Sequence, residues 1–348
     1  MGLEINEILR QCIMIGASDI HLNYHRPPVF RIHGDIVASD QWPLLDAKDT
    51  ESLCRQMMDE ELWKKVENKG ECDFAYAIPG TARFRVNVFK ERGTYGAALR
   101  IINSKILTLE ELKLPAVLGE LAKKPRGLVL VTGPTGSGKT TTLAAMIDLV
   151  NRETKGHILT LEDPIEYIHE HQNCLVTQRE IGSDTQSFAA ALKAALRQDP
   201  DVILLGEMRD LETISTAVTA AETGHLVMAT LHTSSAAQTI ERIIDVFPPH
   251  QQQQIRTQLA ATLQGVVAQT LLKRKDGKGR VAAVEILIGT PAVRNLIREG
   301  KTHQLNSMIQ TGGQFGMQSL DAALRQLINW GVISPEEAAA KGLDLSKR

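Results

Sequence analysis

The segment Gly133–Thr140 places the strongest constraint on the fold, because it matches the pattern G-x-x-x-x-G-K-[ST]. An apolar run over Gly127–Thr132 precedes it, and a helical pattern over Thr140–Val150 follows it. In this strand–loop–helix order, the backbone N–H groups of the glycine-rich loop and of the helix N-terminus can face an anion. The sequence therefore predicts a phosphate-binding loop (P-loop) rather than a structural glycine turn.

The P-loop predicts ATP and Mg²⁺ as cofactors. Lys139 is expected to reach the β- and γ-phosphates, and the Thr140 hydroxyl is expected to ligate Mg²⁺. The residues predicted to bind the nucleotide here are Gly133, Pro134, Thr135, Gly136, Ser137, Gly138, Lys139, Thr140 and Thr141.

Short apolar strands alternate with helices over residues 127–288, which is typical of a parallel sheet in an α/β fold. We predict an N-terminal mixed α/β domain over residues 1–103, a linker over 104–115, a nucleotide-binding core over 116–289 and a helical C-terminal region over 290–348. Expected elements of the N-terminal domain are a helix over Glu4–Ile15, strands over Asp19–Leu22, Val29–Ile32 and Arg83–Phe89, and a helical stretch around Leu53–Val66.

Two further apolar strands, over residues 158–161 and 201–205, are predicted to end in carboxylates. Ligands of parallel α/β sheets bind at the carboxyl ends of the strands, so these side chains are expected near the nucleotide. The second strand resembles a Walker B strand, although Gly206 stands where an aspartate is common. The carboxylates concerned are Glu162, Asp163 and Glu166 after the first strand and Glu207 after the second.

Two histidines bracket a third apolar strand over residues 226–231. Seven residues of regular strand separate them by roughly 23 Å, so both cannot contact one γ-phosphate. His232, at the C-terminal end, is the candidate contact, and the residues themselves favour a structural or interface role for His225.

Arginines in the N-terminal domain are candidates for neutralising phosphate charge from a neighbouring subunit. Arg83 and Arg85 are two apart in a predicted strand and so share one face, and Arg100 follows. A solvated sheet face is the alternative interpretation.

Charge, cysteine spacing and apolar runs exclude other classes of protein. The net charge of −2 argues against a nucleic-acid binder. The four cysteines form no Cys-x-x-Cys pair, and the longest apolar runs fall far below the ~20 residues of a membrane span. His169, His171 and Cys174 lie close together, but a metal site there is not favoured.

Taken together, these motifs resemble the secretion-ATPase superfamily, and within it the type IV pilus retraction ATPases (the PilT family). The resemblance covers nearly the whole chain. Its motifs are Gly16–Leu22, Arg83–Asn87, the P-loop, an Asp box over Leu161–Glu166, a Walker B segment over Gly206–Asp210, a His box from Thr223 to Thr233 and a C-terminal signature over Ala292–Glu299, with Val293 in place of its usual Ile.

The resemblance implies a RecA-like P-loop ATPase core behind a small PAS-like α/β domain, with ATP between the two domains. It implies a homohexameric motor that couples Mg²⁺-dependent ATP hydrolysis to removal of pilin subunits and so to twitching motility. Glu207 and Glu166 would share the metal-water and general-base roles, with Glu207 favoured as essential and as a metal ligand, directly or through water, and Glu166 as the residue that orients water. His225 joins the nucleotide-binding residues through the His box, and His232, Arg83, Arg85 and Arg100 join the catalytic set.

The implied partners are an inner-membrane pilus platform protein and a retraction accessory ATPase, without nucleic acid. The implied location is the cytoplasm, at the cytoplasmic face of the inner membrane. Pilus-extension relatives usually carry a four-cysteine zinc element and a further N-terminal domain, and this sequence has neither the cysteine spacing nor the length expected for them. Two alternatives stay open: a nucleotide-binding accessory subunit of the motor with little turnover, and a P-loop kinase or transferase.

Two further surfaces carry predictions. Arg294 and Arg298 are four apart on the signature helix, and we expect Arg294→Ala to leave folding intact and to weaken retraction. Residues 273–280 are predicted as a solvated basic hairpin tip, with anionic lipid headgroups as the alternative contact. Thr290 and Ser334 are predicted helix N-caps, with Glu337 placed to complete a capping box.

Overall fold

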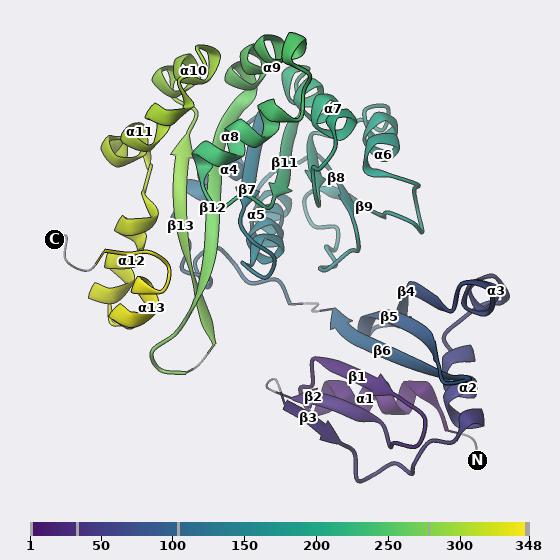
Figure 1. Ribbon diagram of the computed structural model, residues 1–348. Helices are drawn as coiled ribbons and strands as arrows, with labels where there is room; N and C mark the ends of the chain where they lie inside the picture. The colour runs from purple at the N-terminus through teal and green to yellow at the C-terminus, as the bar shows by residue number, and fades with distance from the viewer. Residues whose placement is uncertain (1–2, 33–34, 103–104, 278, 345–348) are drawn as a thin grey trace. The chain divides into compact units, whose positions relative to one another are not determined.

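The computed structural model describes all residues except 1–2, 33–34, 103–104, 278 and 345–348. Contacts divide the chain into two units, residues 1–105 with 166–168 and residues 106–165 with 169–348 (Figure 1). The predicted boundary between the N-terminal domain and the linker falls on residues 103 and 104, outside the described residues.

The first unit is an antiparallel sheet in the order β3-β2-β1-β6-β5-β4 with three helices. Its elements are α1 (Ile5–Met14), β1 (Asp19–Leu22), β2 (Val29–Ile32), β3 (Asp35–Ala38), α2 (Ala47–Arg55), α3 (Glu60–Lys69), β4 (Glu71–Ile78), β5 (Ala82–Glu91) and β6 (Thr94–Ile102). Phe84, Val86 and Val88 are buried on one face of β5, as the alternation of the sequence predicts. The single helical stretch predicted around Leu53–Val66 is instead two helices, because Asp59 caps α3 by accepting from the Leu62 N–H.

The second unit is built on a sheet in the order β13-β12-β7-β11-β10-β8-β9. Its strands are β7 (Gly127–Thr132), β8 (His157–Glu162), β9 (Leu175–Glu180), β10 (Val202–Leu205), β11 (Leu226–Leu231), β12 (Leu263–Lys273) and β13 (Arg280–Ile288). The predicted parallel arrangement holds from β12 to β9, whereas β13 pairs antiparallel with β12 as a hairpin. The α/β class and the RecA-like core are confirmed.

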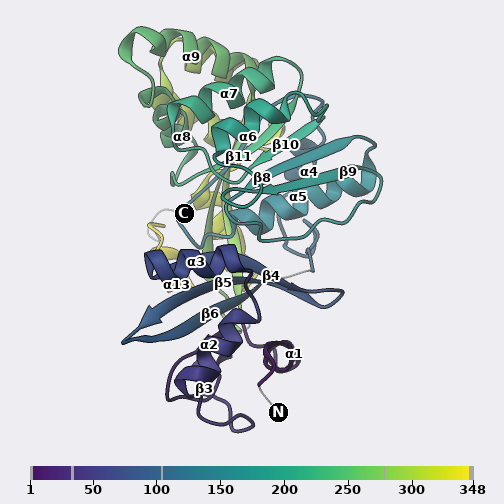
Figure 2. The same cartoon turned by 90° about the vertical axis from the view of Figure 1, so that its right-hand side faces the viewer.

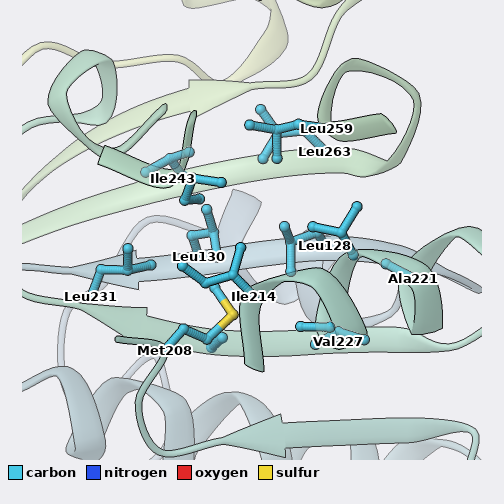
Figure 3. Packing of buried hydrophobic residues seen from close by; sticks show 14 of the residues in the cluster. Leu128, Leu130, Met208, Ile214, Ala221, Val227, Leu231, Ile243, Leu259 and Leu263 are labelled. Atoms are coloured by element: carbon cyan, nitrogen blue, oxygen red, sulfur yellow. The ribbon is translucent and has the colours of Figure 1, made fainter. Parts of the chain in front are cut away.

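Helices cover both faces of this sheet, which is why its central strands are apolar throughout rather than alternating. They are α4 (Val117–Ala122), α5 (Lys139–Glu153), α6 (Phe188–Ala195), α7 (Leu211–Glu222), α8 (Ala236–Asp245), α9 (Pro249–Thr262), α10 (Pro291–Arg298), α11 (Leu305–Thr311), α12 (Leu320–Asn329) and α13 (Pro335–Ala339). Leu128 and Leu130 of β7 pack towards α6 to α11, with Ile214, Ile243 and Leu259 around them (Figure 3). Val129 and Val131 face the opposite layer with α4 and α5 (Figure 2). This double burial fixes β7, and with it the start of the P-loop.

The C-terminal region is helical, as predicted, and it packs against the β12–β13 hairpin. Thr290 and Ser334 cap α10 and α13 through their side chains. Glu337 does not close the predicted capping box. Its Oε1 instead accepts the Lys273 N–H at 2.9 Å, so it ties α13 to the hairpin.

Candidate active site

The P-loop joins the buried end of β7 to the first turn of α5, in the predicted strand–loop–helix order. Gly133, Gly136 and Gly138 have φ of 146°, 78° and 86°, a region that side chains with a Cβ rarely adopt. Gly138 is the N-cap of α5 and offers no side-chain cap, so the first N–H groups of the helix are left for another acceptor. The loop therefore has the backbone of an anion cradle.

Lys139 is folded back over the P-loop. Its Nζ donates to the carbonyl oxygens of Gly133 at 2.8 Å and of Pro134 at 3.2 Å, and the side chain is buried. The Ser137 hydroxyl is also buried, and among the described residues it has no hydrogen-bond partner. A buried ammonium on neutral carbonyls and an unpaired buried hydroxyl both suit a polyanionic ligand. The loop fits a nucleotide phosphate on this observation.

Glu207 and His232 meet at the carboxyl edge of the sheet. Glu207 follows β10, His232 follows β11, and His232 Nε2 lies 2.8 Å from Glu207 Oε1. The Thr230 hydroxyl donates to the Gly206 carbonyl and the Met208 N–H donates to the Thr230 carbonyl, so β11 holds the Glu207 loop. The expected placement of His232 on the P-loop side of the sheet therefore agrees with the structure.

Arg209 is a contact of Glu207 that the sequence pattern does not indicate. Its Nε donates to Glu207 Oε1, and this hydrogen bond raises the pKa of the guanidinium above its ordinary value. The same carboxylate oxygen thus serves a neighbouring arginine and a histidine from the next strand. Glu207 is held in one orientation by charged or polar groups on two sides.

The Asp-box carboxylates differ in their surroundings. Glu162 is buried at the end of β8, where its Oε1 accepts from the Thr160 hydroxyl at 2.7 Å and from Gln178 Nε2 at 3.2 Å. Asp163 is exposed at the same edge of the sheet. Glu166 is exposed and falls with the first unit, whereas the other two belong to the second.

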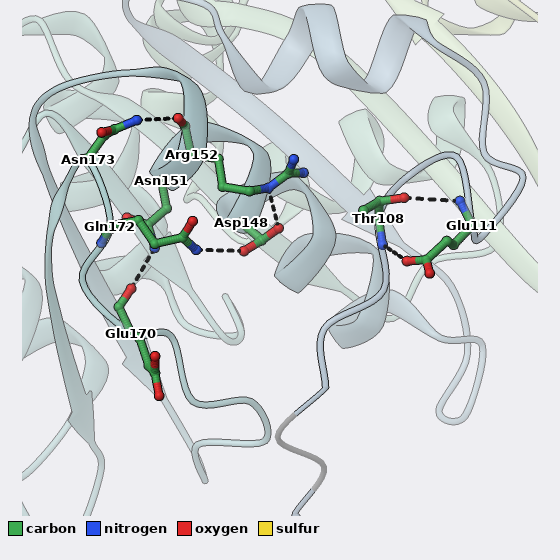
Figure 4. Close-up of polar contacts among 8 residues, drawn as sticks. All are labelled: Thr108, Glu111, Asp148, Asn151, Arg152, Glu170, Gln172 and Asn173. Atoms are coloured by element: carbon green, nitrogen blue, oxygen red, sulfur yellow. Dashed lines mark hydrogen bonds and ion pairs between the residues drawn. The ribbon is translucent and has the colours of Figure 1, made fainter.

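The loop that follows the Asp box is anchored on α5 (Figure 4). Asn151, fully buried, donates to the Glu170 carbonyl at 2.7 Å and accepts from the Gln172 N–H at 3.2 Å. Asp148 accepts from Gln172 Nε2 at 3.2 Å and from Arg152 Nε at 2.8 Å. The helix that begins in the P-loop therefore also supports the loop between β8 and β9.

His171 and Cys174 of this loop make structural contacts, and His169 is buried. Burial lowers the pKa of His169 to about 4, so the ring is neutral. His171 Nδ1 accepts the Val176 N–H, and Cys174 is buried against the Val150 and Thr154 carbonyls. Within the described ranges, no three His, Cys, Asp or Glu side chains are grouped to hold a metal ion.

His225 does not approach the P-loop. It precedes β11, its carbonyl accepts from the Gly127 N–H at the start of β7, and its Nδ1 lies 3.0 Å from the Ala220 carbonyl. The P-loop follows the other end of β7, six residues or roughly 20 Å along the strand. Within one chain His225 lies at the opposite end of β7 from the P-loop, and its role in nucleotide binding stays a prediction.

In the first unit, Arg85 and Arg100 are paired across β5 and β6 and line a cleft of about 240 Å³. Arg100 Nε donates to Asp19 Oδ1 at 2.8 Å. Partial burial opposes the ionisation of Asp19, but hydrogen bonds from Ser18 and Arg100 hold its pKa below the ordinary value. Arg83 lies two residues away on the same strand, opposite Ile102. Sequence reasoning missed Asp19 as the partner that orients Arg100.

A pocket of about 390 Å³ adjoins the first turn of α5. Its walls combine the P-loop end with aliphatic side chains and two arginines from the hairpin. The residues that line it include Leu107, Leu112, Leu114, Gly138, Thr141, Leu271, Arg274, Arg280 and Ala282. A pocket of mixed aliphatic and polar lining beside a phosphate cradle suits the base and sugar of a nucleotide.

Arg294 is not a free surface group, which bears on the prediction that Arg294→Ala leaves folding intact. Its guanidinium donates to the carbonyls of Gly289 at 2.8 Å, Ala261 at 3.2 Å and Leu263 at 3.1 Å. It therefore closes the C-terminal end of α9, and we expect its removal to affect folding. Arg298, one turn on, is exposed.

Comparisons with known proteins identify the family to which this chain belongs. The family model for type II/IV secretion system proteins matches residues 3–338. The type IV pilus retraction ATPase PilT of Pseudomonas aeruginosa is 54% identical over 339 residues, covering 97% of this chain and 98% of that protein. The type IV pilus ATPase PilU of the same organism is 45% identical over 338 residues, covering 97% and 88%. A crystal structure of the pilus retraction motor PilT with bound ADP superposes with a TM-score of 0.93 at 48% identity and covers 99% of each chain.

Proposed function

Because this chain belongs to the family of type II/IV secretion system proteins, we propose that it is a type IV pilus retraction ATPase. The observation that carries the proposal is the juxtaposition on one sheet edge of a complete P-loop with the Glu207–His232 pair. A P-loop alone binds a nucleotide, whereas a carboxylate aligned by a histidine can also position water for hydrolysis.

The site suggests a role for each group. The backbone of residues 133–138 and the N-terminus of α5 would hold the phosphates, and Lys139 would exchange its carbonyl partners for phosphate oxygens. The pocket lined by Leu271 and Arg280 would take the base and sugar. The exchange favours binding because a charge-assisted bond to phosphate is stronger than one to a neutral carbonyl.

Mg²⁺ would be held by Thr140 and Glu207 and would neutralise charge on the β- and γ-phosphates. Mg²⁺ in such sites uses few protein ligands together with phosphates and water. Glu207 and Glu166 would share the metal-water and general-base roles, with Glu207 the essential carboxylate and Glu166 a candidate for orienting water.

The assembly and location are also part of the proposal. A homohexamer would allow Arg83, Arg85 and Arg100 to serve the site of a neighbouring copy, with ATP between the two domains. Among the helices that the structure describes, none has the length and apolar character that crossing a bilayer requires. From the resemblance to retraction ATPases, we place the ring at the cytoplasmic face of the inner membrane, attached through a pilus platform protein and accompanied by an accessory ATPase.

The test is steady-state ATP turnover of the purified chain, followed by pilus retraction in cells. Lys139→Ala should abolish turnover, whereas Lys124→Ala, at an exposed lysine, should not. Glu207→Gln should lose turnover and keep ADP binding, and comparison with Glu166→Gln identifies the general base. A deletion strain should carry excess surface pili and lose twitching; bare cells would contradict the retraction assignment.

The accessory-subunit alternative predicts little turnover by the wild-type chain alone. The higher identity to PilT than to PilU and the intact Glu207–His232 pair favour the motor. A kinase or transferase would transfer phosphate to an acceptor other than water, and native mass measurements under ATP would then find monomers.

A further inference from the structure

Gln269 is a buried side chain on β12 that forms hydrogen bonds with the P-loop and with the start of α5. None of the sequence motifs described above includes it. Its Nε2 donates to the Ser137 carbonyl at 2.7 Å, and its Oε1 accepts from the Thr142 hydroxyl at 2.7 Å. Gln269 is 4% exposed and Thr142 is 1% exposed. One amide group thus bridges the last turn of the loop and the first turn of α5.

The bond to the Ser137 carbonyl fixes the orientation of a peptide plane within the loop. In a trans peptide the C=O and the following N–H point in opposite directions. Because the Ser137 carbonyl points at Gln269, the Gly138 N–H points away from β12. A loop of this type binds phosphate through such N–H groups, so the orientation of this plane determines one of its donors.

Steric contacts show that the loop is fitted to this residue. A Cβ on Gly138 would lie 2.8 Å from Gln269 Nε2, and a Cβ on Gly133 would lie 2.3 Å from the Gln269 backbone oxygen. Gln269 therefore contacts both ends of the P-loop, and glycine at each end is what allows the strand to come so close.

The same face of β12 also serves the neighbouring pocket. Leu271, two residues on, lines that pocket together with Gln269 and Gly138. Residues on one strand face are held at a fixed spacing, so β12 aligns the support of the phosphate cradle with a wall of the pocket.

We propose that Gln269 is the positioning residue of the P-loop, which holds the Ser137–Gly138 peptide in the orientation that binds nucleotide phosphate. The proposal rests on the nucleotide-binding function proposed above and assigns a residue to that same site. Gln269 acts through the loop backbone and does not itself contact the reacting atoms.

The test compares ADP affinity, measured by titration calorimetry on the full chain, with thermal stability. Gln269→Met keeps the length of the side chain and removes both hydrogen bonds. We expect the Kd for ADP and the KM for ATP to rise about tenfold, with kcat within about threefold of wild type, because an unpaired buried carbonyl lets the peptide reorient. The matched control is Gln264→Met on the same strand, because Gln264 Nε2 donates to the Arg126 carbonyl, at the opposite end of β7 from the P-loop.

Two further variants separate the two hydrogen bonds. Gln269→Glu can still accept from Thr142 but cannot donate to the Ser137 carbonyl, and it should weaken ADP binding at least as much as Gln269→Met. Thr142→Val removes only the other bond and should raise the Kd two- to fivefold. Should Gln269→Met fail to fold, these two variants decide the question by the same criterion.

The outcomes are distinguishable. Wild-type ADP affinity in the folded Gln269 variants, or an equal change in Gln264→Met, overturns the positioning role and leaves the ATPase function intact. A wild-type chain that neither binds ADP nor hydrolyses ATP overturns the proposed function itself, whatever the variants do.

Discussion

Replacement of Arg294 by alanine should destabilise the second unit, which is the opposite of what the sequence alone predicts. The guanidinium donates to three backbone carbonyls, two of them at the end of α9 and one at the end of β13. The bonds to Ala261 and Leu263 span 33 and 31 positions in the chain, whereas Gly289 lies five residues before Arg294. Alanine would leave the last turn of α9 without this closure.

The expected loss of unfolding free energy in Arg294→Ala follows from these hydrogen bonds. A hydrogen bond to a charged donor contributes about 1.5–3 kcal/mol where it is well buried. Arg294 is half-buried and Ala261 is exposed, so water can replace part of the loss, and we expect about 2–3 kcal/mol in total. For a unit of this size, that corresponds to a fall in Tm of roughly 5–10 °C.

The assay is thermal and denaturant unfolding followed by circular dichroism, at equal protein concentration and without nucleotide. Arg298→Ala is the matched control, because Arg298 is exposed on the same helix and its guanidinium donates to Asn295 Oδ1 within that helix. It should melt within about 1 °C of wild type. Arg294→Lys should fall between the two, since an ammonium cannot reach three carbonyls in the geometry of a guanidinium.

If the Tm of Arg294→Ala equals those of wild type and of Arg298→Ala, the reasoning is refuted. The melting temperatures of the two variants also decide how a loss of retraction is interpreted. Loss of retraction in Arg294→Ala together with a lowered Tm reports on folding, whereas loss in Arg298→Ala at unchanged Tm would assign docking or transmission of motion to the exposed arginine.

Three further predictions follow from buried groups. His169→Gln should flatten the acid loss of stability. Burial lowers the pKa of His169 to about 4, against about 6.5 in the unfolded chain, so the unfolded state binds more protons between these values and stability falls as the pH falls through this window. At pH 4.5 the wild type should lose about 2–3 kcal/mol more than the variant relative to pH 7, and parallel pH profiles would contradict this. Asn151→Ala should cost about 2–4 kcal/mol in urea unfolding, because it leaves the Glu170 carbonyl and the Gln172 N–H unpaired; a midpoint equal to wild type would argue against the anchoring role. Gly138→Ala should fold and bind ADP at least tenfold more weakly, since φ is 86° and the new Cβ meets Gln269; wild-type affinity by calorimetry would count against the steric argument.

The parts of the site that the sequence predicts are those encoded within a few consecutive residues. The P-loop, the carboxylate after β10 and the histidine after β11 all follow from a strand and the residues directly beyond it. Parallel strands bring their carboxyl ends to one edge, so Glu207 and His232 could be expected to meet. Local pattern and topology together were sufficient there.

The parts that the sequence does not predict depend on contacts between distant segments. Gln269 meets Ser137 across 132 positions, and Arg100 meets Asp19 across 81. Arg294 meets the end of α9 across 33 and 31 positions, and the helical pattern of α10 alone suggests a free polar face. A polar side chain in a pattern indicates that it needs a partner but not which one, and only the packed fold supplies that answer.

The way in which the P-loop is held at its two ends bears on how the site can bind. At its start, the Gly133 N–H donates to the Leu231 carbonyl of β11, one residue before His232. At its end, Gln269 of β12 holds the Ser137 carbonyl. Only the tip, residues 134–136, is exposed. Because the strands on both sides of β7 fix the ends, few backbone torsions remain to be ordered when phosphate binds, and a movement of either strand would reach the loop directly.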